Sequence, residues 1–363
     1  MTTDDLPEDT RFAQDLDEVT PERPTLPDGW TVEDPGTGSA ALTDELVALL
    51  RAHEEAARGY AGAGEDDVAM RCSPASELTH ANLVLRDPTG AVRAWGSAQD
   101  RAVNRMIYDH VVARDLAEAD AERCSEVLLG WAEAQARKLG EARELEVQQI
   151  DAGAFVDDER QHRWFAAAGF SHTRTWWQMS RPVTAEEGDL VEDPAHWEDG
   201  GVVVRLVDRE GSDMPEEDDL RAVHDVLESA FLDHFNSREE SFGEFLHRLR
   251  EDPGHRWHHW WLAEIVDGEE RTPAGALVGT IVENADGPNA SYVDYIGVLE
   301  NARGRGVAKG LLRTVIADAA RRGRDRVGLE VDADSPTGAD GLYTSMGWET
   351  TYRTQSWHRD VRI

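Results

Sequence analysis

Residues 294–313 read DYIGVLENARGRGVAKGLLR, and this stretch decides the fold. It joins an apolar strand sequence to a helix sequence through a turn that contains glycine and arginine. The first backbone N–H groups of a helix have no partner within the helix, and they carry a positive partial charge. Two arginines, Arg303 and Arg305, lie in the same turn. The stretch therefore predicts a binding site for a polyanion such as a pyrophosphate.

The overall charge of the chain makes this basic turn a local exception. The 363 residues include 73 Asp and Glu against 37 Lys and Arg, which gives a formal net charge of -36. Nucleic acid and anionic membrane surfaces are not expected as partners, because a chain this acidic forms no extended basic face. A chain of this length also favours two domains over one.

Cysteine use and the N-terminal sequence predict a soluble, cytoplasmic protein. Only Cys72 and Cys124 occur, so neither a disulfide framework nor a thiolate metal cluster is expected. The start, MTTDDLPED, lacks the basic and apolar regions of a signal peptide. No apolar run approaches the roughly 20 residues of a membrane span. We expect a monomer or a homodimer.

Proline, acidic residues and apolar periodicity predict the organisation of the chain. Residues 1–27 predict an acidic disordered tail, and residues 184–200, which hold no Lys or Arg, predict an acidic linker. The segment 201–363 has the periodicity of a mixed α/β domain. Its predicted strands are 202–207, 257–265, 275–282, 291–299, 326–331 and 351–361, and its predicted helices are 216–235, 242–249, 306–322 and 339–346.

The two halves of the chain resemble each other at an offset of 178 residues. Residues 165–170, FAAAGF, lie over residues 343–348, YTSMGW, and Arg181 lies over Arg359. Several matches in the same order predict a duplicated domain, whose first copy spans residues 28–183.

Three kinds of phosphate-binding turn compete for residues 303–308. A P-loop requires Gly-x-x-x-x-Gly-Lys-Ser/Thr, and a dinucleotide-binding turn requires Gly-x-Gly-x-x-Gly; the residues around Lys309 fit neither spacing. The pattern Arg303-x-x-Gly306-x-Ala308 instead resembles the Arg/Gln-x-x-Gly-x-Gly/Ala signature of GNAT-type N-acetyltransferases. The later sequence LYTSMGW, residues 342–348, is similar to the Leu-Tyr-x-x-x-Gly-Phe ending of that family.

This resemblance implies a fold and a co-substrate. The implied fold class is α/β (α+β), with two tandem GNAT-like domains that each have a mixed, mostly antiparallel sheet flanked by helices. The arrangement is similar to that of mycothiol synthase and related actinobacterial proteins. The implied co-substrate is acetyl-CoA, and no metal is implied. The resemblance assigns acetyl-CoA binding to Ile296, Gly297, Val298, Arg303, Gly304, Arg305, Gly306, Val307, Ala308 and Lys309.

The resemblance also suggests catalytic residues. Tyr343 matches the tyrosine that often protonates the CoA sulfur in the family, although a half-buried aromatic anchor is the alternative. Many relatives carry a glutamate where this chain has Tyr292. Strand alternation places Tyr292 and Asp294 on the same face as Ile296 and Val298. Asp294 is therefore a candidate base; orientation of a cationic substrate, a salt bridge to an arginine and proton relay through water stay open.

Two histidine-containing segments have competing interpretations. Asp233 and His234 lie at the end of the predicted helix 216–235, a place that often borders the acceptor site in the family, yet a histidine at a helix C-terminus also acts as a dipole partner or cap. Residues 255–261, HRWHHWW, suggest a metal site or an aromatic cage. Core packing is favoured, because no second cluster of ligands is nearby in the sequence.

The first copy lacks the features of the cofactor site. Residues 113–124 contain no glycine and four acidic residues, and Phe165 stands at the position of Tyr343. We therefore expect one acetyl-CoA site per chain. The predicted function is acetyl-CoA-dependent N-acetyl transfer to a primary amine, of a small cationic molecule in preference to a protein, by direct attack in a ternary complex. A CoA-binding sensor or interaction module without turnover is one alternative, and mycothiol synthase itself is another.

Overall fold

The computed structural model describes residues 25–33, 40–72, 80–189, 201–208, 214–231, 241–251, 254–282, 289–334 and 338–363. Most of the predicted tail, most of the predicted linker, and Asp233 and His234 therefore lie outside the described residues. The linker residues that are described, Ala185–Asp189, form a short 3-10 helix, η2. This helix packs against the helix Val307–Arg321 (α8) of the second half, because a Cβ added to Gly188 would lie 3.4 Å from Cγ of Arg321.

The first half of the chain forms a sheet with helices on both faces. Its elements are β1 (Thr31–Glu33), α1 (Ala40–Arg58), α2 (Glu65–Arg71), β2 (His80–Arg86), β3 (Val92–Ala102), β4 (Arg105–Val112), α3 (Glu118–Ala142), β5 (Val147–Phe155), α4 (Glu159–Ala167) and β6 (Ser171–Pro182). One core cluster joins α1 and α2 to the strands, and a second joins α3 and α4 to them.

The second half repeats this order. Its elements are β7 (Val202–Leu206), α6 (Glu217–Phe231), α7 (Phe242–Glu251), β8 (His255–Asp267), β9 (Glu270–Val282), β10 (Ala290–Val298), η3 (Glu300–Ala302), α8 (Val307–Arg321), β11 (Arg326–Asp332), α9 (Ala339–Ser345) and β12 (Glu349–Arg362). The helices α6 and α7 share one core cluster with the strands, and α8 and α9 share another. The observed bounds agree with the predicted ones to within a few residues. The agreement arises because the spacing of apolar residues within each element indicates a helix or a strand locally.

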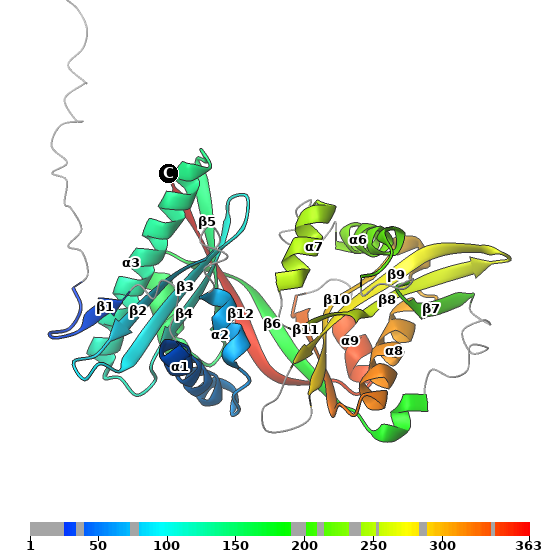
Figure 1. Cartoon of the computed structure of the whole chain (residues 1–363), viewed down its shortest axis with the longest axis horizontal. Coiled ribbons are helices and arrows are strands. Elements are labelled where there is room, and N and C mark those ends of the chain that lie inside the picture. The colour runs from blue at the N-terminus through cyan, green and yellow to red at the C-terminus, as the bar shows by residue number, and fades with distance from the viewer. Residues whose placement is uncertain are drawn as a thin grey trace, which may run out of the picture.

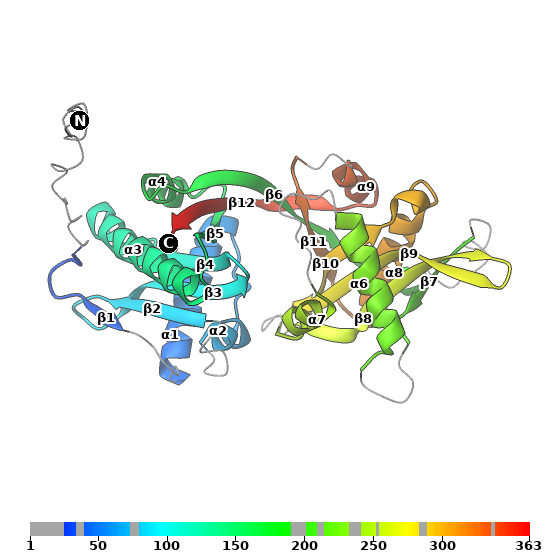
Figure 2. The ribbon, with the colours of Figure 1, turned by 90° about the horizontal axis from the view of Figure 1, so that it is seen from above.

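The two halves share one twelve-stranded sheet with the order β1-β2-β3-β4-β5-β12-β6-β11-β10-β9-β8-β7. β6, from the first half, pairs with β11 of the second half, and β12, from the second half, pairs with β5 of the first half. Figures 1 and 2 show these two long strands running side by side between the halves.

The predicted domains, residues 28–183 and 201–363, are therefore linked through one shared sheet. Each half obtains one strand of its sheet from the other half. The exchange is possible because the edge of a sheet can pair with any strand whose alternation of side chains fits. A strand that follows a long connection can therefore pair with the sheet of the other half. Among the described residues, none of the helices combines the length and the apolar character that crossing a bilayer requires.

Candidate active site

The sheet opens into a fork between β10 and β11. The parallel pairing of these strands joins Ser291 to Val327 and ends at Val293 and Leu329. A register shift follows directly in β10, between Val293 and Tyr295, where this strand pairs with β9. Asp294 is therefore the extra residue of a β-bulge, which bends the strand. Residues 296–298 of β10 are not in the register of pairs with β11, so their backbone groups on that side can bind a ligand that extends along the strand.

The bulge corrects the predicted arrangement of side chains on β10. Ile296 and Val298 pack into the core cluster that includes α8. Tyr295 packs into the cluster of α6 and α7 on the opposite face, together with Gly297, where an added Cβ would lie only 2.9 Å from Cβ of Ala230. The prediction that Ile296 and Val298 share a face with Tyr292 and Asp294 is therefore wrong, because the extra residue inverts the alternation.

The turn after β10 leads into α8 with a left-handed backbone at two glycines. Gly304 has φ 78° and Gly306 has φ 84°, and Gly306 is the N-cap of α8. A Cβ added to either glycine would meet no atom within 4 Å, so the turn is open. The first residue of α8, Val307, is buried, because the helix presses on β9 at Gly275. Positive φ and open space together account for glycine at both positions.

The basic side chains of this turn are available to a ligand. Arg303, Arg305 and Lys309 are exposed, while Ala308 is half-buried. No side chain caps the N-terminus of α8, so its first N–H groups stay free to bind an anion. The structure thus brings the predicted phosphate-binding residues together at one exposed helix end.

Tyr343 lies on α9 and belongs to the core cluster that also contains residues of α8. The side chain is 7% exposed, and its ring centroid lies 6.1 Å from that of Trp348. Burial raises the pKa of this phenol to about 12. Tyr343 therefore keeps its proton at neutral pH, so it can anchor the helix and also act as an acid.

A hydrogen-bonded cluster occupies the face of the fork that points away from α8. The hydroxyl of Tyr292 donates to Oε1 of Gln178 at 3.4 Å. The amide Nε2 of Gln178 donates to the carboxylate of Glu330 and, at 3.4 Å, to Oγ1 of Thr354. Burial, followed by the negative charges of Glu330 and Asp294, raises the pKa of Tyr292 well above its ordinary range. A phenol in this state is a poor base, which argues against Tyr292 as the proton acceptor.

Sequence reasoning missed Gln178 and Glu330. Burial raises the pKa of Glu330, and the hydrogen bond from Gln178 acts in the opposite direction. Glu330 is nevertheless exposed, so a ligand can reach its carboxylate. Glu330 alternates with the buried Leu329 and Val331 along β11. This alternation could have placed Glu330 on the opposite face of the sheet from the sequence alone. Gln178 had no such signal, because it comes from the other half of the chain.

The His-Trp segment of β8 is mostly part of the core. Trp260 and Trp261 are buried in two different core clusters, so the expectation of core packing is confirmed for these two residues. Within the described part of the chain, no three His, Cys, Asp or Glu side chains are grouped closely enough to hold a metal ion.

The corresponding fork of the first half is filled by its own helix. The parallel pairing of β4 with β5 ends at Tyr108 and Ala152. Just beyond it, Nε2 of Gln161 donates to the carbonyl oxygens of His110 at 3.0 Å and of Gly153 at 3.4 Å, so this side chain bridges the two strands.

A second side chain from α4 occupies the same fork. Nη2 of Arg160 donates to the carbonyl oxygen of Val112 at 3.1 Å. At the offset of 178 residues, the second half has Gly338 and Ala339 in place of Arg160 and Gln161. These small residues have no side chain that could fill the fork between β10 and β11.

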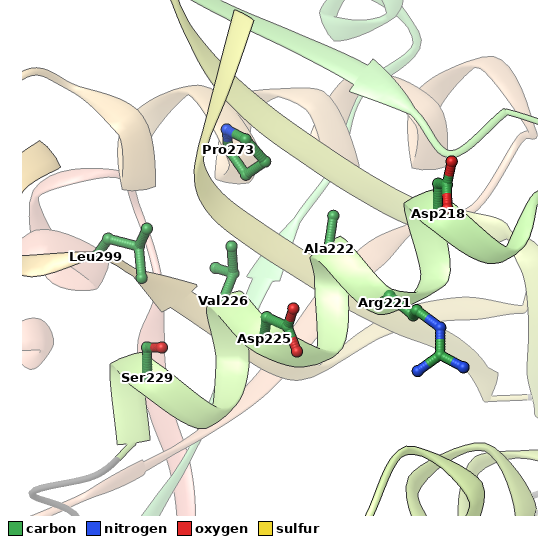
Figure 3. Close-up of a pocket in the computed structure, with 8 residues that line it drawn as sticks. All are labelled: Asp218, Arg221, Ala222, Asp225, Val226, Ser229, Pro273 and Leu299. Carbon is green, nitrogen blue, oxygen red and sulfur yellow. The ribbon is translucent and has the colours of Figure 1, made fainter.

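A hollow of about 330 Å³ lies beside α6, next to the end of β10 (Figure 3). Its lining includes Ala222 and Val226 of α6 and Leu299, which precedes the turn. A hollow of the same size, about 330 Å³, lies beside α1 in the first half. Equivalent backbone hydrogen bonds border the two hollows, from Ala113 to Arg93 at 2.8 Å and from Leu299 to Ala274 at 2.9 Å. The hollow is thus common to both halves and does not distinguish one half from the other.

Comparisons with known proteins agree with this geometry. Residues 220–348 match the model of the acetyltransferase (GNAT) family. A mycothiol acetyltransferase of Frankia casuarinae is 26% identical over 344 residues, which are 89% of this chain and 96% of the relative.

Two solved structures have the same fold. A GCN5-related N-acetyltransferase of Sphaerobacter thermophilus aligns with a TM-score of 0.69 at 22% identity, over 93% of this chain and 98% of that one. A tandem GNAT protein from the clavulanic acid biosynthesis pathway aligns with a TM-score of 0.66 at 14% identity, over 92% of this chain and 99% of that one. The second half of the chain thus matches the GNAT family of acetyltransferases, and the whole chain has the fold of tandem GNAT proteins.

Proposed function

We propose that the chain moves the acetyl group of acetyl-CoA to a primary amine of a small cationic molecule, by direct attack in a ternary complex. The observation that carries the proposal is the contrast between the two forks. The fork of β10 and β11 has the open Gly304 and Gly306 turn beside it. The fork of β4 and β5 is bridged by Gln161.

We place acetyl-CoA in the open fork in one orientation. Its pyrophosphate would lie at the N-terminus of α8, against Arg303, Arg305 and Lys309, which are exposed there. Its pantetheine arm would extend along the backbone of residues 296–298, beyond the bulge of β10. The thioester would then reach the mouth of the fork. Anion binding at a helix N-terminus and hydrogen bonding to an unpaired strand edge supply the affinity.

Direct attack is favoured over an acyl-enzyme because no thiol is suited to form one. The two cysteines of the chain, Cys72 and Cys124, both belong to the first half and are buried. Burial raises the pKa of Cys124 to about 12, so it carries little thiolate at neutral pH. Tyr343, whose pKa is also about 12, is the proposed donor of the proton that the departing CoA sulfur takes up.

A cationic acceptor is favoured by charge. The formal net charge of -36 attracts amines in their ammonium form, and the face of the fork adds the carboxylates of Asp294 and Glu330. A second candidate function follows from the 26% identical relative that is named mycothiol acetyltransferase. Formation of an acetylated product from a cysteinyl sugar amine would test that candidate.

The proposed function is tested with the purified full chain. Calorimetric titration should give saturable binding of acetyl-CoA, and a thiol reagent should detect CoA release when a panel of primary amines is added. Binding without thiol release across the panel would indicate a CoA-binding module instead. Absence of acetyl-CoA binding would contradict the proposal altogether.

A further inference from the structure

We infer that Glu330 receives the amine group of the acceptor and that Gln178, supplied by the first half of the chain, is the positioning residue that holds this carboxylate. The inference rests on the proposed function, since it names the group that the open fork presents to the acceptor.

Glu330 stands at the mouth of the fork. The last parallel pair of β10 and β11 joins Val293 to Leu329, so Asp294 and Glu330 are the first residues beyond it on the two strands. Leu329 and Val331 are buried against α8 and α9. Because side chains alternate along a strand, Glu330 lies on the opposite face. An acceptor must approach from that face, because the core cluster closes the other one.

Gln178 fixes the orientation of this carboxylate. Gln178 lies directly opposite Glu330 in the register of β6 and β11. Its Nε2 donates to Oε2 of Glu330, and its Oε1 accepts the hydroxyl hydrogen of Tyr292 at 3.4 Å. Oε1 of Glu330 makes no hydrogen bond to any residue within the described ranges. One carboxylate oxygen is therefore held in place, and the other is left for a ligand.

The charge around Glu330 also points to a cationic ligand. The neighbouring carboxylate on β11, Asp332, is 3.2 Å from Nε of Arg174. Glu330 has no such ion pair among the residues that the structure describes. The other titratable groups that act on this cluster are Tyr292, Asp294, Tyr295 and Tyr352. Of these, Tyr352 accepts a hydrogen bond from Nη1 of Arg58 at 2.9 Å. A partly desolvated carboxylate without a cation is costly, and an ammonium group would remove that cost.

The assigned roles give a balanced reaction. The ammonium form of the acceptor first gives one proton to water, because only the neutral amine has a lone pair that can attack. The amine nitrogen then forms a bond to the acetyl carbon, and the carbon–sulfur bond of the thioester breaks. Glu330 takes the second proton that the nitrogen loses, and the sulfur takes a proton from Tyr343. Both side chains then return to their starting states by exchange with water. Glu330 is suited to the first transfer because burial raises its pKa toward neutrality.

The test compares E330Q with E349Q. Glu349 is an exposed carboxylate on β12, so its replacement changes the net charge equally. CoA release is measured with acetyl-CoA and four alkylamines (glucosamine, histamine, cadaverine and tyramine) and with aniline, which is neutral at pH 7. We expect E330Q to lower kcat/KM for the alkylamines by about 10²-fold or more and for aniline by less, with acetyl-CoA binding retained. We expect E349Q to behave as the wild type.

The pH profile of Q178L tests the positioning role. The hydrogen bond from Gln178 lowers the pKa of Glu330, so its loss should move the acidic limb of kcat/KM to higher pH. A purely structural role for Gln178 would lower activity without moving this limb.

The possible results distinguish a failure of the inference about Glu330 and Gln178 from a failure of the proposed function. Unchanged kcat/KM in E330Q, or an unmoved acidic limb in Q178L, would overturn the inference while the proposed function stands. If the wild type releases no thiol with any of the five amines, the proposed function fails instead.

Discussion

Nη1 of Arg324 donates a hydrogen bond to Nε2 of His259 at 2.7 Å, inside the protein between β8 and the end of α8. Arg324 is 7% exposed and His259 is fully buried. Because a guanidinium can only donate, Nε2 of His259 must accept, and the imidazole is neutral. Burial, followed by the charge of Arg324, lowers the pKa of His259 to about 2.

This pair predicts a loss of stability in mild acid. The unfolded chain protonates the histidine below a pH of about 6.5, whereas the folded chain does not. The contribution of His259 to stability is therefore complete above that pH and declines as the pH falls toward 2, by up to about 1.4 kcal/mol per pH unit. H259Q, which keeps an acceptor for Arg324, should flatten the dependence of the denaturant midpoint on pH. H172Q, at an exposed site, is the control, and equal slopes for both variants would contradict the prediction.

The filled fork of the first half predicts one acetyl-CoA per chain. Calorimetry should give a stoichiometry of one for the wild type. In R160G/Q161A, which copies the residues of the second half, the carbonyl groups of His110 and Val112 lose their donors. We expect an unchanged stoichiometry, because residues 113–117 offer no glycine turn, and a loss of about 1–3 kcal/mol in unfolding free energy. Two molecules bound to the wild type would refute this assignment.

The turn before α8 predicts a local effect on binding. Gly306 and Gly323 lie at opposite ends of α8, both have positive φ, and an added Cβ meets no atom within 4 Å at either. G306A and G323A should therefore lose similar stability, about 1–2 kcal/mol each. Only G306A should weaken acetyl-CoA binding, because its methyl group lies where the pyrophosphate is proposed to bind.

Charge reversal in the same turn gives a stronger test. R303E/R305E should remove measurable acetyl-CoA binding and leave the melting temperature close to that of the wild type, because both side chains are exposed. Retained affinity in this variant would show that the pyrophosphate binds elsewhere.

The burial of Tyr343 predicts the behaviour of a variant without the hydroxyl. Y343F should lower kcat by about 10²- to 10⁴-fold, as expected for the loss of a general acid, with little change in the dissociation constant of acetyl-CoA. Because the pKa of Tyr343 is about 12, its ionisation should produce no basic limb in the wild-type profile below about pH 11. A wild-type rate in Y343F would leave Tyr343 as an aromatic anchor only.

The exchanged strands predict that the halves cannot act separately. Fragment 201–363 lacks β6, which covers one edge of β11, and fragment 1–189 lacks β12, which covers β5. We expect each fragment alone to aggregate and the two together to regain activity. The control is the intact chain cut at a protease site inserted within residues 190–200. It should stay assembled and active, and separation of the cut pieces on a sizing column would contradict the exchange.

The helices, the strands and the glycine turn before α8 could be predicted from local sequence. Gly304 and Gly306 occupy positive φ, and apolar spacing marks α8, because these properties depend on a few neighbouring residues. The family resemblance rests on the same short stretches.

The pairing of the strands and the contacts between distant side chains became known from the folded structure. The bulge at Asp294 depends on the partners of β10, and it moved Ile296 and Val298 to the other face. Gln178 and Glu330 are 152 residues apart and meet because β6 crosses into the second half. The alternation of side chains within a strand depends only on local sequence. The partner of a strand depends on all the strand edges that are available in the folded chain.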